Sequence, residues 1–328
     1  ADMHFSYCGQ HSDRRRTNGR YMKPLHIQTP LFESRALGDI AGRTVLLKME
    51  PMQPPGSFKI RGIGAACQEY ARRGPKRFIS SSGGNAGIAV AYAGRLLSLP
   101  VLVVVPETTT ERAKALIRQE GAEVKVHGES WFEANALAQS LITSTDAFLH
   151  PFDDPLVWTG HSSLVDEVAE SGVKPDAVVL SVGGGGLLSG ILEGMHRHGW
   201  NDVPVVAVET VGADSLAQSV TAGEPAVLPS IKSIATSLGA TRVCDQAFEW
   251  TQRHAVRNVV LTDRQAVGAC LRFIDDQRLV VEPACGAALA AVYERAPEIE
   301  EFNTILVVVC GGVTATLEQL EEWANAPE

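Results

Sequence analysis

Lys59 is the residue of this chain that is best suited to covalent or acid–base chemistry. It lies between Phe58 and Ile60, in the segment Pro-Gly-Ser-Phe-Lys-Ile-Arg-Gly of residues 55–62. Lysine is strongly hydrated and is rarely placed among apolar side chains without a task. Burial disfavours the charged ammonium, and the lowered pKa prepares the amine to act as a base or to form an imine. The segment therefore predicts a reactive lysine.

Two glycine-rich segments each follow a strand-like run and precede a helix-like one. Residues 80–87 read Ser-Ser-Ser-Gly-Gly-Asn-Ala-Gly, and residues 183–186 are four consecutive glycines, called here the tetraglycine loop. A helix N-terminus offers free N–H groups and the positive end of its dipole to an anion. Because each glycine has an entropic cost, we interpret four in a row as an anion site and not as a packing requirement. We interpret residues 80–87 as a carboxylate site, with ordinary capping by Ser82 or Asn85 as the alternative.

An imine-forming amine, a phosphate site and a carboxylate site are the parts that an enzyme using pyridoxal phosphate needs. Dinucleotide binding by an NAD-dependent oxidoreductase is the alternative use of the tetraglycine loop. Its G-x-G-x-x-G register fails, because Leu188 or Ser189 stands where the third glycine belongs. Glu209 nevertheless ends the next predicted strand, where a ribose-binding acid would lie. The chain has no HExxH, P-loop or G-x-S-x-G motif.

The composition indicates the number of domains, the classes of partner and the cellular compartment to expect. The 328 residues, 45% hydrophobic and 20% charged, predict two domains or one large α/β unit. The net charge of −9 argues against a nucleic-acid partner. The basic run at residues 14–16 is interpreted as an arm outside the fold. Six cysteines without a C-x-x-C pair, and no apolar leader or membrane-spanning run, predict a cytoplasmic protein that does not contact membranes.

Short valine-rich runs alternate with amphipathic segments, which predicts an α/β fold with open, mostly parallel sheets. Strands are expected at residues 45–49, 77–81, 101–105, 123–126, 147–149, 177–182, 205–209 and 305–309. Helices are expected at residues 86–97, 110–119, 131–142, 188–198, 264–275 and 317–324, with a capping box from Thr262 and Gln265. The sequence Pro-Phe-Asp-Asp-Pro at residues 151–155 interrupts this alternation of strand-like and helix-like segments. We therefore expect a small domain at residues 53–155 and a large domain at residues 1–52 and 156–328.

From about Pro24 to its C-terminus the chain resembles the fold-type II pyridoxal-phosphate enzymes, specifically the serine dehydratase/threonine deaminase family. The matching motifs are those at residues 55–62, 81–87, 151–155, 182–188 (Val-Gly-Gly-Gly-Gly-Leu-Leu), 282–288 (Glu-Pro-Ala-Cys-Gly-Ala-Ala) and 309–312 (Val-Cys-Gly-Gly). The resemblance implies two open, mostly parallel, twisted sheets flanked by helices, with the cofactor in the cleft between two domains. It also implies a homodimer.

The resemblance assigns roles residue by residue. Lys59 is the catalytic residue, which binds the cofactor as an imine and later moves the substrate's α-proton. The other cofactor-binding residues are Phe58, Asn85, Gly183, Gly184, Gly185, Gly186, Leu187, Ser237 and Cys310. The substrate carboxylate is held by Ser82, Gly83, Gly84 and Asn85. A monovalent cation, expected to be potassium, is held at Gly183, Glu209, Ala213, Leu238 and Ala240.

The activity that the resemblance implies is the elimination of water from a small amino acid. L-serine would give pyruvate and ammonia, and L-threonine would give 2-oxobutanoate and ammonia. A β-replacement synthase, a racemase or a D-serine deaminase on the same scaffold are the alternatives. Serine racemases of this fold carry a serine immediately before Gly-Asn, where this chain has Gly83. Since glycine has no side-chain proton to give, we expect poor racemisation.

Overall fold

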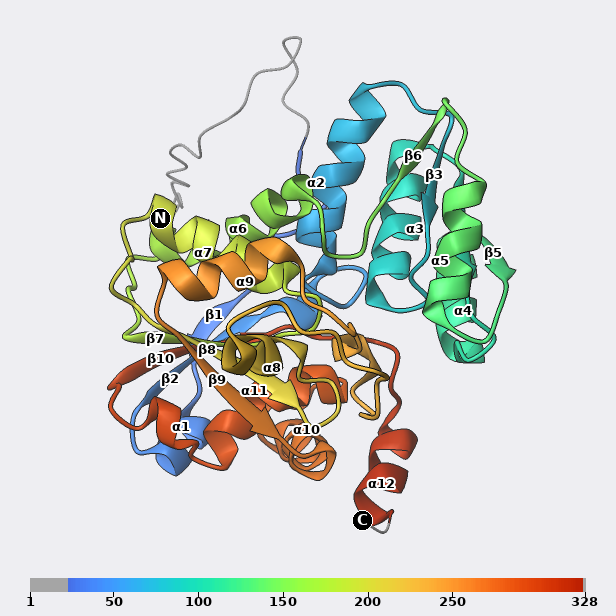
Figure 1. Cartoon of the computed structure of the whole chain (residues 1–328). Helices are drawn as coiled ribbons and strands as arrows, with labels where there is room; N and C mark the ends of the chain where they lie inside the picture. Colours follow the sequence, from blue (N-terminus) through green and yellow to red (C-terminus); the bar gives the residue numbers. More distant parts are fainter. Residues whose placement is uncertain (1–22, 327–328) are drawn as a thin grey trace, which may run out of the picture.

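The computed structural model describes residues 23–326 and contains two separate sheets (Figure 1). The strands are β1 (Leu31–Glu33), β2 (Thr44–Met49), β3 (Arg77–Ser80), β4 (Val101–Val105), β5 (Glu123–Val126), β6 (Asp146–Phe148), β7 (Ala177–Ser181), β8 (Val205–Thr210), β9 (Val256–Leu261) and β10 (Thr304–Val309). The basic run at residues 14–16 and Cys8 lie outside the described residues.

Twelve α-helices and three short 3-10 helices connect and cover the strands of the described part. The α-helices are α1 (Arg35–Ala41), α2 (Lys59–Arg72), α3 (Asn85–Leu97), α4 (Glu111–Gln119), α5 (Trp131–Ser140), α6 (Pro155–Glu170), α7 (Gly186–Arg197), α8 (Ser215–Ala222), α9 (Asp245–Arg253), α10 (Asp263–Gln277), α11 (Pro283–Tyr293) and α12 (Leu317–Asn325). The 3-10 helices are η1 (Glu50–Met52), η2 (Thr236–Leu238) and η3 (Pro297–Ile299). Thr262 and Gln265 form the predicted capping box at the start of α10.

The larger sheet has the order β1-β2-β10-β7-β8-β9. All neighbouring strands are parallel except β1 and β2, which are antiparallel. Pairing of β2 with β10 places residues 44–49 in this sheet, as the sequence predicted. Every residue of β7 and β8 is buried, which is typical of parallel strands covered by helices on both faces. Figure 1 shows α6, α7 and α9 above this sheet and α1, α10 and α11 below it.

The smaller sheet is entirely parallel, with the order β5-β4-β3-β6. All five residues of β4 are buried, and alternate residues belong to different apolar clusters. Val101, Val103 and Val105 pack with residues of α2, α3 and α4. Leu102 and Val104 pack with residues of α5. The helix α2 contacts both α3 and α6, so it joins the part of the chain around the smaller sheet to the larger sheet's helices.

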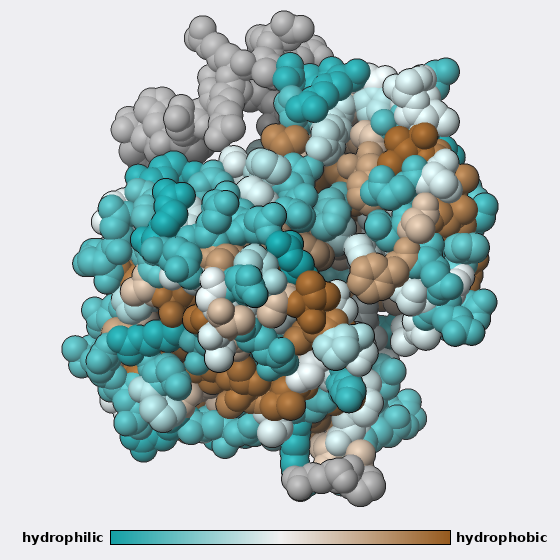
Figure 2. All heavy atoms as spheres, viewed as in Figure 1, coloured by the Kyte–Doolittle hydropathy of each residue, from teal (hydrophilic) through white to brown (hydrophobic). Residues whose placement is uncertain are grey.

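Exposed apolar residues lie over α8 and the edge strand β9 on the face shown in Figure 2, among other places. Val211, Val220 and Val260 are exposed there. A groove of about 440 Å³ is lined by Asp214, Ala217, Gln218, Thr221, Ala222 and Val260. Within residues 23–326 no helix combines the length and the apolar character that crossing a membrane requires.

Candidate active site

The side chain of Lys59 lies at the first turn of α2, against the segment that connects β6 to α6. Its Nζ donates a hydrogen bond to the carbonyl oxygen of Pro151 at 2.9 Å. Burial lowers the pKa of Lys59 to about 8, although Cys310 and Glu282 act in the opposite direction. The amine therefore gives up its proton far more readily than an exposed lysine, as a base or an imine-forming group requires.

The segment before Lys59 is tied to the end of β10. The N–H group of Phe58 donates to the carbonyl oxygen of Cys310 at 3.1 Å, and Gly312 N–H donates to Gly56 O at 2.9 Å. These bonds place the Cys310 side chain beside the start of α2. A hydrogen bond with Cys285 and burial raise the pKa of the Cys310 thiol, so Cys310 is neutral.

The tetraglycine loop connects β7 to α7, and packing requires glycine at all four positions. A Cβ on Gly184 would lie 2.3 Å from the Phe152 ring, and one on Gly186 would lie 2.6 Å from the Phe152 carbonyl oxygen. A Cβ on Gly183 would lie 2.9 Å from Leu238 Cα, and Gly185 has a φ of 88°, which favours glycine. Our argument from the sequence, that a glycine run cannot be a packing solution, is therefore wrong.

A different feature of the loop supports an anion site. The helix α7 begins at Gly186 with Gly185 as its N-cap, and no side chain caps its first turn. The N–H groups of that first turn, which include Leu187, are therefore available to an anion. Phe152, which packs on the loop, directly follows Pro151, the acceptor of the Lys59 amine. The Lys59 amine and the start of α7 thus contact two consecutive residues of the same connecting segment.

Asn85 is the first residue of α3, and its amide joins groups from distant parts of the chain. Its Nδ2 donates to Glu282 Oε1 at 2.7 Å and to Ser237 Oγ at 3.4 Å. Its Oδ1 accepts a hydrogen bond from the Val313 N–H group at 3.2 Å. The amide is thereby held at the meeting point of α3, η2 and the start of α11, next to the residues that follow β10.

Glu282 is a site residue to which the sequence analysis gave no role. It is buried, accepts a hydrogen bond from Thr314 Oγ1 at 2.6 Å, and lies close enough to Lys59 to raise the pKa of that amine. Burial raises the pKa of Glu282, while hydrogen bonds from Ser237, Thr314 and Asn85 oppose that shift. Its position at the head of the motif at residues 282–288 is the signal that could have drawn attention to it.

The predicted carboxylate site lies in the loop that leads into α3. Ser82, Gly83 and Gly84 are partly exposed, whereas Asn85 is buried. Gly84 is the N-cap of α3 and no side chain caps this helix, so ordinary capping by Ser82 or Asn85 is not what the structure shows. A Cβ on Gly83 would lie 2.6 Å from Thr109 Oγ1. The Gly84 N–H group donates to Ser82 Oγ at 3.4 Å, and the N–H groups of the first turn of α3 are open to an anion.

Glu209 ends the strand β8, and its carboxylate is completely buried. It accepts hydrogen bonds from the N–H groups of Leu216 at 2.9 Å and Ala217 at 2.8 Å, at the start of α8. Burial raises the pKa of Glu209 to about 8. Both oxygens are occupied by main-chain donors, which argues against the ribose-binding role of the dinucleotide alternative.

The other residues of the predicted cation site lie at the ends of neighbouring strands. Ala213 pairs with Thr210 just after β8, and Gly183 follows the adjacent strand β7. Leu238 lies against Gly183, and its carbonyl oxygen accepts a hydrogen bond from Ala240 at 2.7 Å. No cluster of three or more His, Cys, Asp or Glu side chains suited to a metal occurs within residues 23–326.

These residues fit pyridoxal phosphate by their donor chemistry. Lys59 supplies an amine of lowered pKa, and the start of α7 supplies uncapped N–H groups. The Ser57 hydroxyl, two residues before Lys59, is buried and has no hydrogen-bond partner in the described structure. A buried polar group without a partner is expected where a ligand binds.

The comparisons with known proteins agree with this chemistry. Residues 22–311 match the model of a family described as pyridoxal-phosphate dependent enzyme. The mouse protein named serine dehydratase-like is 48% identical over 311 residues, which cover 92% of this chain and 94% of the relative. The human L-serine dehydratase/L-threonine deaminase is 46% identical over 309 residues, with 91% and 94% covered.

Solved structures lead to the same family. The crystal structure of a fungal L-serine ammonia-lyase from Rhizomucor miehei is similar with a TM-score of 0.87 and 34% identity, over 92% of this chain and 98% of that one. The predictions of the family and of the fold class, two mostly parallel sheets flanked by helices, are thus confirmed. The chain belongs to the family of pyridoxal-phosphate dependent enzymes.

Proposed function

We propose that this chain removes water from L-serine and from L-threonine, giving pyruvate or 2-oxobutanoate together with ammonia. The bovine, human and mouse proteins named L-serine dehydratase/L-threonine deaminase are 45–46% identical to the chain over most of its length. The observation that carries the proposal is the Lys59 amine, whose pKa burial lowers to about 8 and whose acceptor Pro151 precedes the Phe152 that packs on the tetraglycine loop.

The cofactor would be held by residues from both sides of the cleft. The N–H groups of the tetraglycine loop and Leu187 would bind its phosphate, and Asn85 would bind the ring oxygen. Phe58 and Ser237 would cover the two ring faces, with Cys310 at the ring nitrogen. When bound, pyridoxal phosphate supplies an aldehyde that joins an amino group and a ring that withdraws electrons from the α-carbon.

The chain's own groups then move the protons. The freed Lys59 amine takes the proton from the α-carbon, while Ser82, Gly83, Gly84 and Asn85 hold the substrate carboxylate. The electron pair left on the α-carbon forms the Cα–Cβ double bond as the β-hydroxyl takes up a proton and leaves as water, and no net proton is consumed once Lys59 gives up its own. Water then hydrolyses the released enamine to the keto acid and ammonia. The neutral Cys310 thiol cannot hold the ring nitrogen protonated as a carboxylate would, so elimination is favoured over reprotonation.

The test uses the purified protein supplied with pyridoxal phosphate. We expect visible absorbance that borohydride removes, a corresponding mass increase on the peptide that contains Lys59, and release of keto acid from L-serine and L-threonine. Keto acid from D-serine alone would favour a D-serine deaminase. A substrate-derived absorbance that persists until a thiol is added would favour a β-replacement synthase. A colourless protein without added mass would contradict the proposal.

Racemisation is tested at Gly83. A serine there would meet the Thr109 side chain, whose Oγ1 lies 2.6 Å from the Cβ position. We therefore expect Gly83→Ser combined with Thr109→Ala to gain racemisation of L-serine that wild type and Thr109→Ala alone lack. A double variant that binds the cofactor and releases no D-serine would remove this explanation of specificity.

We further propose that a potassium ion binds at Gly183, Glu209, Ala213, Leu238 and Ala240. The support is the buried Glu209 carboxylate, whose pKa is raised to about 8 and which accepts hydrogen bonds from the main-chain N–H groups of Leu216 and Ala217. A cation would favour the ionised form, so its affinity should rise as the pH increases toward 8. Glu209→Gln should make turnover equal in potassium and in sodium, whereas a retained potassium preference would exclude this site.

The domain boundaries, oligomeric state and location belong to the proposal as well. We propose a small domain at residues 53–155, a large domain at residues 1–52 and 156–328, and a cytoplasmic homodimer. The five cysteines in the described part are buried and free of disulfides, which suits a reducing compartment. Sedimentation at micromolar concentration and limited proteolysis near residues 53 and 155 test the dimer and the boundaries.

A further inference from the structure

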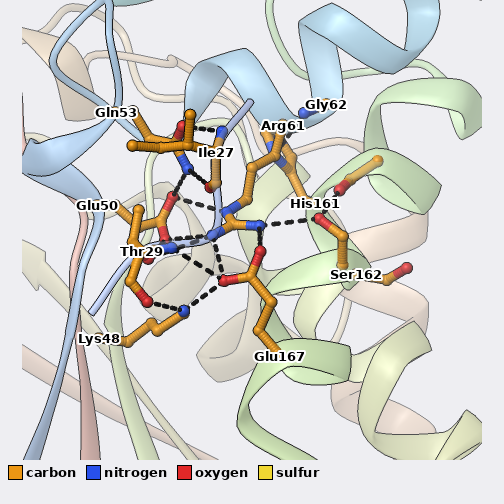
Figure 3. Close-up of polar contacts among 12 residues, drawn as sticks. Ile27, Thr29, Lys48, Glu50, Gln53, Arg61, Gly62, His161, Ser162 and Glu167 are labelled. Atoms are coloured by element: carbon orange, nitrogen blue, oxygen red, sulfur yellow. Dashed lines mark hydrogen bonds and ion pairs between the residues drawn. The ribbon is translucent and has the colours of Figure 1, made fainter. Parts of the chain in front are cut away.

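A buried ion cluster is centred on Arg61, in the same first turn of α2 as Lys59, and takes no part in the proposed reaction (Figure 3). It consists of Thr29, Lys48, Glu50, Arg61 and Glu167, and is called here the Arg61 cluster. Lys48 and Arg61 balance Glu50 and Glu167 in charge. Its members come from residues before β2, from β2, η1, α2 and α6, so it joins several elements at one point.

Arg61 is the centre of the cluster and is completely buried. Its Nε and Nη2 donate to the two oxygens of Glu50 at 2.7 and 2.8 Å. Its Nη1 and Nη2 donate to the two oxygens of Glu167 at 2.7 and 2.9 Å, and Nη1 also donates to Ser163 Oγ at 3.2 Å. The five N–H groups of the guanidinium thus all have acceptors, in a geometry that a lysine cannot reproduce.

Stability alone is a weak explanation for this arrangement. Burying four charges carries a large desolvation cost, and apolar side chains of similar volume often replace such clusters without loss of stability. Placing a positive charge in the first turn of a helix is also unfavourable, because it opposes the helix dipole. The helix α2 has no acidic residue in its first turn and no side-chain cap. Glu50 and Glu167, which belong to η1 and α6, supply the negative charge that the first turn of α2 lacks.

The helix α6 holds the same turn at two further points. The N–H group of Gly62 donates to His161 Nδ1 at 3.2 Å, and the rings of His161 and Phe58 lie 4.9 Å apart. A Cβ on Gly160 would lie 2.5 Å from the carbonyl oxygen of Arg61, so the two helices touch through their backbones. Because the backbones of α2 and α6 are in direct contact, the two helices cannot slide past each other. The ion pair between Arg61 and Glu167 therefore joins two elements that are fixed relative to one another.

We propose that Arg61 is a positioning residue for Lys59, an inference that rests on the proposed function. Its bonds to Glu50 and Glu167 fix the first turn of α2 and thereby hold the Lys59 amine on the Pro151 carbonyl. The effect is geometric, because burial, Cys310 and Glu282 set the pKa of Lys59 and the Arg61 cluster is balanced in charge. Displacing a reacting group by about 1 Å lowers rates by about 100-fold.

The test compares Arg61→Lys with Arg72→Lys in the cofactor-loaded protein. Arg72 lies on the same helix, is 49% exposed and pairs with Glu69, so it is the matched control. We expect Arg61→Lys to lower kcat about 100-fold with an unchanged KM, and to shift the pH midpoint of the visible absorbance. Arg72→Lys should behave as wild type. The titratable groups near the Lys59 amine, which are His150, His161, Glu282 and Cys310, are unaltered in both variants.

Glu167→Gln provides a second variant that decides the matter if Arg61→Lys does not fold, because it keeps the shape of the cluster and removes one charge. We expect a loss of about 10-fold in kcat with an unchanged KM. Folded variants that keep the wild-type kcat and midpoint while only the melting temperature falls would overturn the proposal. If wild type releases no keto acid but Arg61→Lys alone shifts the midpoint, positioning stands and the proposed reaction fails.

Discussion

Lys59 and Arg61 lie in the same helical turn, and their surroundings are opposite. The guanidinium of Arg61 has two carboxylate partners and an acceptor for each N–H group. Lys59 has one hydrogen bond, to Pro151, and the nearby Ser57 hydroxyl has none in the described structure. A satisfied cluster fixes the backbone, whereas groups with unused hydrogen-bonding capacity are available to a ligand. The comparison therefore distinguishes Arg61, which fixes the backbone of this turn, from Lys59, which is available to react.

The largest effect is expected on the reactive side. Lys59→Ala should lower kcat by at least about 10⁴-fold and abolish the absorbance that borohydride removes, because both depend on one amine. The measurement is keto-acid release from L-serine, with the exposed Lys174→Ala as the matched control. Turnover within tenfold of wild type would mean that another group removes the α-proton.

The carboxylate of Glu282 accepts a hydrogen bond from Asn85, and its replacement can be compared with replacement of the carboxylates that bind Arg61. Glu282→Gln should lower kcat about 10- to 100-fold, because a neutral amide weakens charge-assisted bonds to Asn85 and Thr314. Thr314→Val, which removes one of these bonds and keeps the charge, should cost less. Steady-state kinetics of both variants measure this, and an unaffected Glu282→Gln would assign the carboxylate a purely structural part.

The pKa of Lys59 predicts that cofactor uptake depends on pH. Burial lowers that pKa to about 8, and only the neutral amine forms an imine. The rate at which the cofactor-free protein takes up pyridoxal phosphate should therefore rise with pH around a midpoint near 8, against about 10.4 for an exposed lysine. Stopped-flow absorbance measures the rate, and a midpoint near 10 would contradict the burial of the amine.

Two serines give the smallest predicted effect. Ser163 Oγ donates to Gly160 O at 2.7 Å and accepts from Arg61, whereas Ser57 Oγ has no partner among residues 23–326. In the cofactor-free protein, Ser163→Ala should lower the free energy of unfolding by about 1 kcal/mol and Ser57→Ala should change it little. Ser57→Ala should instead weaken cofactor binding. If urea unfolding shows equal losses of unfolding free energy for the two variants, the distinction between the surroundings of Arg61 and those of Lys59 would not hold.

Elements with a clear period or a continuous apolar run were predictable from the sequence. The strands β4 and β5 begin and end at the predicted residues, because β4 is a continuous apolar run and β5 alternates charged residues with valines. The helix α11 was missed because all of its residues are buried, so it shows no polar face. The edge strand β9 was missed because Arg257 and Asn258 interrupt its apolar run.

The candidate site was predictable where local sequence carries the signal, as at Lys59 and the tetraglycine loop. Contacts between residues far apart in the chain were not. Asn85 and Glu282 are separated by 197 positions, and nothing in either segment alone shows that they meet. The Arg61 cluster has the same origin, because Arg61 and Glu167 become partners only when α2 packs on α6. The sequence analysis gave Arg61 no role for this reason.

The contact between Gly62 and Gly160 has a consequence for how this chain tolerates change. A methyl group on Gly160 would lie 2.7 Å from the Gly62 Cα, so one added carbon would force the two helices apart. That separation would pull the guanidinium off one carboxylate and shift the lysine at the same time. The positions least free to vary during evolution therefore include two that carry no side chain and never meet the substrate.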